Sequence, residues 1–285
     1  MMNSLKIKIG GVPEHFNFPW HQGTQNGLFE KQHIQLEWQN MPGGTGEMSE
    51  ALENRKLDLA IMLTEGCLLK INQGSPIQVL QQYIASPLFW GIYTHPDNAV
   101  TRNDLADKTA AISRFGSGSH LMAIVNAKQN NWPTNEINFY KADNLNGAIQ
   151  SIYDGKADYF LWEHFTTKPY VDRSQLKFLG DCPTPWPCFV IAGRTNFINK
   201  HQQKIKVLLQ SINQITEKFK NQKNIVDFLA SEYGLRTNDT KEWLKLTEWS
   251  QQQISESAIE KVQHYLKAID LIEKPENPSF YTVDL

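Results

Sequence analysis

The feature that most constrains this 285-residue chain is a unit of helix, turn and strand that occurs twice. Residues 51–65 read ALENRKLDLAIMLTE, and residues 148–163 read AIQSIYDGKADYFLWE. In each copy a short helical stretch leads to Lys-x-Asp and then to an apolar strand that runs up to Glu65 or Glu163. A helix that ends and feeds a buried strand needs turn residues at that point, and Gly155 suits the second copy. We interpret Lys-x-Asp as a helix cap and turn rather than as catalytic, and the repeat predicts two α/β units of similar design.

Helix-like and strand-like segments alternate through the first two thirds of the chain, which is typical of an α/β fold with largely parallel strands. Strands are expected at 5–11, 34–38, 57–63, 76–85, 88–94, 109–113, 137–142, 157–163, 176–180 and 188–193. Helices are expected at 44–54, 68–73, 119–130 and 145–153. The last ninety residues are mainly helical, with one apolar helix face over 205–219 and further helices near 224–232, 239–252 and 255–268.

Composition excludes several classes of partner. The net charge is −2 with both signs mixed along the chain, so neither nucleic-acid binding nor attraction to an anionic membrane is expected. No apolar run approaches the roughly 20 residues of a membrane span. The start, MMNSLKIKIGG, lacks the apolar core of a secretory signal, which predicts a cytoplasmic location for the chain as given, or a periplasmic one if a leader has been removed.

The three cysteines do not form the pattern of a disulfide framework. Cys182 and Cys188 flank a Pro-rich turn and would pair only if oxidised. The eight histidines show no HxH, HxxxH or HExxH spacing, and Cys67 has no evident histidine partner. Neither a metal site nor thiol catalysis is therefore expected, and no cofactor is predicted.

A Gly/Ser-rich loop, SRFGSGSH, precedes an apolar helix at residues 113–120. No Lys follows the glycines as in a phosphate-binding P-loop, Leu121 stands where GxGxxG needs glycine, and Phe115 and Ser119 replace the glycines of a GxSxG elbow. A helix start rich in N–H groups and hydroxyls can hold an anion or a polar oxygen, or can simply be a serine-capped turn. The ligand-binding candidates here are Arg114, Gly116, Ser117, Gly118 and Ser119.

Two segments of the first half carry candidates of the same kind. In GGTGEM (43–48), Gly44 and Thr45 open a helix that Thr45 can cap. The aromatic loop at 13–29 follows the first strand, and loops at the carboxyl ends of parallel strands are favoured ligand positions. Phe18, Trp20 and His21 are the ligand-binding candidates of this loop. Packing alone could explain Phe18, and Trp20 with His21 is the better candidate for stacking on a ligand.

Acidic and aromatic residues at two strand ends complete the candidate site. Glu65 and Glu163 are suited to accept hydrogen bonds from a ligand N–H, or are solvated acids or helix caps instead. Trp162 beside Glu163 is suited to form an aromatic wall. Together with the Gly-rich helix starts, these residues suit an anion, a zwitterion or a substituted nitrogen heterocycle.

Several segments, taken in order, resemble a known family. They are GLFEKQHIQLEW, GGTGEMSEALENRKLDLAI, ISRFGSGSH, GKADYFLWEHF and FVIAGRTNFINKH. They look like type II periplasmic-binding-protein folds, and most like the ABC-transporter solute-binding proteins for nitrate, sulfonates, taurine and thiamine-pyrimidine precursors. The LTEG at 63–66 is similar to a subgroup without an obvious transporter role.

The resemblance implies two α/β lobes, each a mixed sheet flanked by helices, joined by crossing strands at 88–94 and 188–193. The first lobe would comprise 1–90 and 190–285, and the second 91–189. A small-molecule ligand would lie in the cleft between them, and the lobes would close on it by a hinge. An ABC permease is the partner that such a receptor would have.

We therefore expect non-enzymatic binding of a small organic molecule or anion, by a transport-type binding protein or a cytosolic relative. The alternative is an enzyme on the same fold, related to thiamine-pyrimidine precursor synthesis and using His21, Glu163 or Cys67. Two departures matter: exported receptors carry an export signal, and the enzyme branch carries a cysteine-rich iron motif, and the sequence shows neither. A ligand sensor that acts on another protein ranks third.

Overall fold

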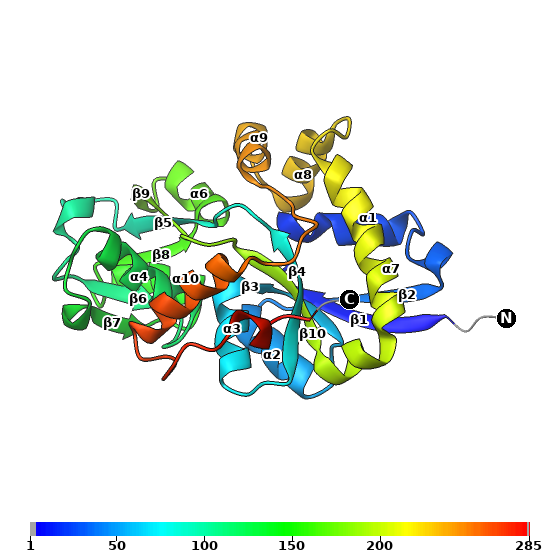
Figure 1. The fold of residues 1–285 in the computed structure, drawn as a ribbon. Helices are drawn as coiled ribbons and strands as arrows, with labels where there is room; N and C mark the ends of the chain where they lie inside the picture. Colours follow the sequence, from blue (N-terminus) through cyan, green and yellow to red (C-terminus); the bar gives the residue numbers. More distant parts are fainter. Residues whose placement is uncertain (1–3, 284) are drawn as a thin grey trace. The chain divides into compact units, whose positions relative to one another are not determined.

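The computed structural model describes residues 4–283 and 285, and it divides into two compact units (Figure 1). The first unit is assembled from residues within 1–86, 186–264 and 272–285. The second comprises Pro87–Pro185 and Tyr265–Leu271. The chain thus leaves the first unit after Ser86 and returns at Trp186, slightly before the predicted boundaries at 90 and 189. The second unit also includes the short C-terminal segment Tyr265–Leu271, which was predicted to belong to the first lobe.

The first unit contains a five-stranded sheet in the order β2-β1-β3-β10-β4. Its strands are β1 (Leu5–Gly11), β2 (Ile34–Asn40), β3 (Leu59–Leu63), β4 (Ile77–Ile84) and β10 (Phe189–Arg194). Strand β1 runs parallel to β2 and β3, whereas β10 runs antiparallel to β3 and β4. Its helices are α1 (Phe18–Gln25), α2 (Gly44–Glu53), α3 (Thr64–Asn72), α7 (Thr195–Phe219), α8 (Ile225–Tyr233), α9 (Thr237–Leu246) and most of α10 (Glu256–Lys267).

The second unit repeats this arrangement with the strand order β7-β6-β8-β5-β9. Its strands are β5 (Phe89–Thr94), β6 (Thr109–Ile112), β7 (Asn138–Lys141), β8 (Tyr159–Glu163) and β9 (Lys177–Pro183). Strand β6 is parallel to β7 and β8, and β5 is antiparallel to β8 and β9. Its helices are α4 (Gly118–Gln129), α5 (Leu145–Tyr153), α6 (His164–Asp172) and the end of α10 (Glu256–Lys267).

Both sheets are therefore mixed, as the resemblance implies, and not largely parallel, as the simple alternation of segments suggests. The chain passes from one unit to the other directly before β5 and β10, the two segments expected at the crossings, and β5 belongs to the second sheet and β10 to the first. Short 3-10 helices complete the chain at His15–Asn17, Glu30–Gln32, Arg102–Asp104, Thr134–Glu136 and Pro278–Phe280.

The repeated Lys-x-Asp has a structural role in both units, but not that of a helix cap. The backbone N–H of Lys8 on β1 donates to Asp58 Oδ2 at 2.9 Å. In the second unit the backbone N–H of Thr109 on β6 donates to Asp158 Oδ2 at 2.8 Å. Each aspartate thus fixes the start of its own strand, β3 or β8, against the neighbouring parallel strand.

The turn before each aspartate is left-handed in both copies. Arg55 has φ +59° and Gly155 has φ +67°, immediately after the ends of α2 and α5. Glycine adopts this conformation without the steric cost that Cβ imposes on other residues. The repeat therefore extends to backbone conformation, and the second copy has the better residue for it.

Helix α6 is the main element absent from the sequence prediction. Pro169 lies inside it, and a proline in a helix interior removes a hydrogen bond, so the segment lacks the pattern of a helix. Helix α7 begins at Thr195, ten residues before the predicted apolar face, and has a non-helical residue at His201. No described helix is long and apolar enough to cross a bilayer.

Candidate functional site

The helix starts in each unit lie at the carboxyl ends of parallel strands. In the first unit α1, α2 and α3 follow β1, β2 and β3; in the second, α4, α5 and α6 follow β6, β7 and β8. Parallel neighbours end at the same edge of a sheet, so three helix starts gather along one edge in each unit. These two sheet edges contain most of the residues predicted to bind a ligand.

In the second unit, the hydroxyls of the Gly/Ser loop hold the loop together. Ser117 caps α4, with its Oγ accepting from the His120 N–H at 3.3 Å. Ser119 Oγ accepts from the Ser113 N–H at 2.9 Å and lies 3.1 Å from Ser117 Oγ. Gly116 has φ +77°, a conformation that suits glycine. The serine-capped turn considered from the sequence is thus present at the start of α4, where Gly118 is the first helical residue.

Two side chains beside this loop escaped the sequence prediction. Phe115 is 65% exposed, and its ring lies 5.3 Å from that of His120. His120 Nδ1 accepts from the Gly116 N–H at 3.1 Å, and burial lowers the pKa of the imidazole. Arg114 is exposed, so its guanidinium is accessible to a ligand. A large apolar residue within a Gly/Ser loop was the available sequence signal for Phe115.

At the end of β8, Glu163 caps a helix and is buried. Its Oε2 accepts from the Thr166 N–H at 2.6 Å, at the start of α6, and burial raises the pKa of the carboxyl. Trp162 is half-buried and packs against the apolar core of the second unit. Trp90 on β5 is the direct partner of Glu163 across the sheet, and cross-strand partners share a face. The indole N–H of Trp90 is buried and has no hydrogen-bond partner within the described part of the chain.

In the first unit, the starts of α2 and α3 touch each other. Thr45 Oγ1 accepts from the Leu63 N–H at 3.1 Å, which joins the first turn of α2 to the end of β3. A Cβ on Gly66 would lie 2.6 Å from Thr45 Cγ2, so the close approach requires glycine there. Thr45 is therefore not the helix cap expected from the sequence. The Gly43 N–H instead donates to Glu47 Oε2 at 2.7 Å.

Glu65 lies in the first turn of α3 and is 2% exposed. Its Oε2 accepts from the indole N–H of Trp186 at 2.8 Å, whereas Oε1 is buried without a hydrogen-bond partner among the residues described. Burial raises the pKa of the carboxyl to about 7, opposed by the backbone N–H and by Trp186. Because Glu163 is a helix cap and Glu65 is not, the two acids that the repeat paired are not structural equivalents.

The loop after β1 contains a second buried acceptor. Asn17 is 1% exposed; its Nδ2 donates to the Val12 carbonyl at 2.9 Å, and its Oδ1 has no partner in the described structure. His15 nearby is enclosed by aromatic rings, with the Trp243 ring 4.1 Å away, and burial lowers its pKa to about 3. Neither residue was among the candidates predicted from the sequence.

The aromatic candidates of α1 belong mainly to the core. Trp20 is fully buried and stacks with Phe29, and Phe18 is also buried, so neither offers a free ring face. The stacking role predicted for Trp20 is therefore dropped from the site. His21 is half-buried and contacts the Trp38 ring edge-on at 4.9 Å. Burial lowers the pKa of His21, and the charge of Glu232 partly opposes this.

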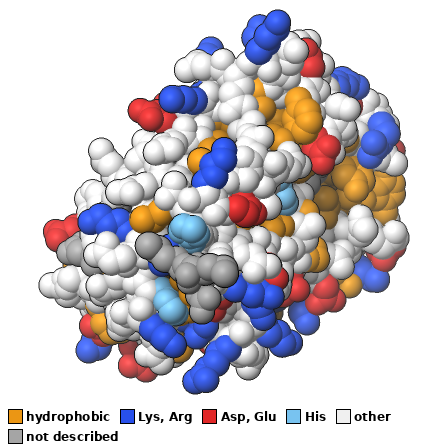
Figure 2. Space-filling view, turned by 90° about the vertical axis from the view of Figure 1, so that its right-hand side faces the viewer, with side chains coloured by type: hydrophobic (Ala, Val, Ile, Leu, Met, Phe, Trp, Pro, Cys, Tyr) orange, Lys and Arg blue, Asp and Glu red, His pale blue; other side chains and the backbone are white. Residues whose placement is uncertain are grey.

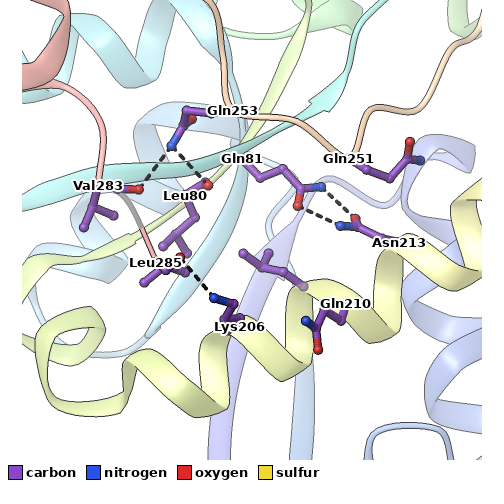
Figure 3. A pocket seen from close by; sticks show the side chains of 10 residues that line it. Leu80, Gln81, Lys206, Gln210, Asn213, Gln251, Gln253, Val283 and Leu285 are labelled. Atoms are coloured by element: carbon purple, nitrogen blue, oxygen red, sulfur yellow. Dashed lines mark hydrogen bonds between the residues drawn. The ribbon is translucent and has the colours of Figure 1, made fainter.

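A separate pocket of about 220 Å³ lies in the first unit between β4, α7 and the last residues of the chain (Figure 3). Its polar groups already bond one another: Gln81 Nε2 donates to Asn213 Oδ1 at 2.8 Å, and Asn213 Nδ2 donates back at 3.0 Å. Gln253 Nε2 donates to the Val283 carbonyl at 3.2 Å. These bonds fix the C-terminal residues against the unit.

The described residues contain no group of three or more His, Cys, Asp or Glu side chains that could hold a metal ion. No disulfide joins Cys182 to Cys188, and both are buried. Figure 2 shows acidic and basic side chains interspersed over one face, in keeping with the mixed charge of the sequence.

Comparison with known proteins decides the fold. A family model described as Ca3427-like PBP, a periplasmic-binding-protein family, matches residues 90–182. The CA3427 gene product of Candida albicans, described as having the generic periplasmic-binding-protein fold, superposes with a TM-score of 0.87 and 25% identity over 98% of both chains. This chain has the type II periplasmic-binding-protein fold. The resemblance inferred from the ordered motifs is confirmed.

Two other similar solved structures hold small acidic molecules. The alkanesulfonate-binding protein SsuA of Xanthomonas axonopodis pv. citri, bound to MOPS, has a TM-score of 0.82 at 14% identity, over 99% of both chains. PhnD1 of Prochlorococcus marinus, in complex with methylphosphonate, has a TM-score of 0.64 at 10% identity, over 95% of this chain and 100% of the other. No curated protein matches the chain in sequence.

Proposed function

We propose that this chain binds a small organic molecule or anion, without chemical conversion, at the helix starts described above. The observation that carries the proposal is a set of buried polar atoms left without partners at these sheet edges. They include Asn17 Oδ1 and Glu65 Oε1 in the first unit and Trp90 Nε1 in the second. His15 Nε2 and Trp20 Nε1, in the segment after β1, are likewise buried without a partner among the described residues. Each such atom costs about 1–3 kcal/mol of stability, a cost that a ligand with matching groups would remove.

The start of α4 supports an acidic group on the ligand. The first N–H groups of a helix lack internal partners and carry the positive end of the helix dipole, which favours an oxyanion. Arg114, exposed next to this loop, can add a charge-assisted hydrogen bond. The sulfonate and phosphonate ligands of SsuA and PhnD1 are of this chemical class.

Two of the three residues named for an enzyme, Cys67 and Glu163, are poorly placed for catalysis. Cys67 is fully buried, and burial raises the pKa of its thiol to about 12, which disfavours the reactive thiolate. The Glu163 carboxylate is occupied in capping α6. Both observations favour binding over thiol or acid–base chemistry.

The role of this binding would be that of a transport receptor working with an ABC permease, or of a cytosolic relative. Both roles start with the same reversible step. The closure of two lobes on the ligand stays a prediction, to be checked by small-angle scattering with and without a bound compound.

The test is a thermal-shift screen followed by recovery of the bound compound. The panel contains nitrate, ethanesulfonate, methylphosphonate, propionate, taurine, β-alanine, pyrimidine and 2-aminopyrimidine. A compound present at 100 times its Kd should stabilise the protein by about 2.7 kcal/mol. Mass spectrometry should then recover it unchanged. A panel without any stabilising compound, or a compound recovered in altered form, would refute the proposal.

A further inference from the structure

We propose that the first unit selects ligands with an N–H donor, which Glu65 Oε1 and Asn17 Oδ1 accept, and that binding releases the proton from Glu65. The inference rests on the proposed function and deepens it by naming the group that is recognised. The matching ligands are primary amines, amidines and amino-substituted heterocycles. A zwitterion is included, because its acidic group is free to bind elsewhere.

Within the described part of the chain, Glu65 lacks a hydrogen-bond partner for one of its two carboxylate oxygens. One carboxylate oxygen is occupied by the Trp186 indole at 2.8 Å, and the other is buried with no partner among the described residues. The hydroxyls of two threonines on these helix starts are already engaged: Thr64 donates to the Pro187 carbonyl, and Thr45 accepts the Leu63 N–H. With the close contact between Thr45 and Gly66, this fixes the start of α3 and hence the backbone that holds Glu65.

The missing group is a hydrogen-bond donor. A protonated Glu65 would itself donate a hydrogen bond, so Glu65 alone does not decide the question. Asn17 does, because its Nδ2 is held by the Val12 carbonyl at 2.9 Å and the atom left over is the amide oxygen, which can only accept. Asn17 and Glu65 follow the neighbouring parallel strands β1 and β3, so they belong to the same sheet edge.

The elements that contact α3 are α2, β3, β4 and β10, and their titratable groups are the ones that could affect the charge of Glu65. Strand β3 has no titratable side chain. On α2, Glu47 bonds to the Gly43 N–H, and Glu50 and Glu53 lie further along the helix. On β4, the Tyr83 hydroxyl donates to the Phe16 carbonyl. On β10, Arg194 forms an ion pair with Asp58 at the end of the strand. Leu63, which precedes α3, pairs with Phe189 at the start of β10, so Arg194 is at the far end of the strand from α3. On α3 itself, Lys70 lies in the last turn and Cys67 is a buried thiol.

None of these groups provides Glu65 with a cation, since burial and two N–H donors are the influences on its pKa. The acid is therefore partly protonated near neutral pH. A ligand donor at Oε1 favours the ionised form, so the proton leaves as the ligand binds. Affinity for such a ligand should consequently rise with pH.

The experiment uses matched probes that differ by one amino group: taurine with ethanesulfonate, β-alanine with propionate, and 2-aminopyrimidine with pyrimidine. Affinities are measured by calorimetry at pH 6 and pH 8 in buffers free of sulfonate. At least one amino compound should bind more tightly than its partner. Its affinity should rise about tenfold from pH 6 to pH 8 if Glu65 titrates near 7.

Glu65→Gln keeps the shape of the side chain but cannot ionise, and it should abolish the pH dependence and weaken the amino compound. Glu50→Gln, an exposed acid on α2, is the matched control and should change neither. Binding that is equal or stronger for the amino-free partners overturns this inference and leaves the proposed function standing. If none of the probe compounds binds, both this inference and the proposed function are refuted. The pH profile of the unmodified chain decides the question even if Glu65→Gln fails to fold.

Discussion

Replacing Glu65 with Gln should change how the stability of the free protein depends on pH. The carboxyl has a pKa of about 7 in the folded chain, against an ordinary value of 4.5. The folded state therefore binds this proton more tightly than the unfolded state does. Its contribution to stability is full below pH 4.5 and is lost as the pH rises through 7.

The magnitude follows from the difference of 2.5 between the two values. At about 1.4 kcal/mol per unit, the ionised Glu65 costs about 3 kcal/mol at pH 8 and almost nothing at pH 4. Gln does not ionise, so the variant escapes this cost. The free energy of unfolding of Glu65→Gln, relative to the parent chain, should rise by about 3 kcal/mol from pH 4 to pH 8.

The assay is urea unfolding followed by circular dichroism at several pH values, with Glu50→Gln as the control. Acids elsewhere titrate equally in both proteins and cancel in the difference between the curves. A difference that stays flat across pH would show that Glu65 ionises as it does in water. That result would refute the claim that its carboxylate is buried with Oε1 unpartnered among the described residues.

Two single variants and one double variant test other parts of the account. Gly66→Ala should destabilise the first unit by about 1–3 kcal/mol in chemical unfolding, because its Cβ would lie 2.6 Å from Thr45 Cγ2; an unchanged midpoint would contradict this contact. Arg55→Gly should stabilise the chain by about 0.5–1 kcal/mol, since φ is +59° there; a lower melting temperature would count against it. Ser117→Ala with Ser119→Ala should cost about 1 kcal/mol of stability through the lost cap of α4 and should weaken an anionic ligand. Unchanged affinity would leave this segment a plain helix cap.

The sequence predicted most of the elements because their signals are local. The repeat located two central strands, and the Gly-rich segments at 44 and 118 marked real helix starts. These two helix starts are not counterparts, however, because α2 follows β2 whereas α4 follows β6. By strand order the counterpart of α4 is α1, with Asn17 and Ser117 preceding the two helices. Glycine content indicates the shape of a turn, but it carries no information about strand order.

The site residues that escaped prediction depend on distant chain segments. Trp186 reaches Glu65 because the chain returns to the first unit there, after residues 87–185 of the second. Trp90 faces the same side as Glu163 because β5 pairs with β8. Neither pairing leaves a trace in the local sequence. The same limit explains Trp20, since an aromatic residue in a core and one on a ligand have similar neighbours in sequence.

The central claim is that this chain holds a small molecule and releases it unaltered, and native mass spectrometry tests it most directly. The protein would be incubated with the compound from the panel that stabilises it best and examined at once and after a long interval. We predict one equivalent of bound compound, with the mass of the intact molecule at both times. A spectrum of protein without bound compound, or a bound mass that changes with time, would contradict the account.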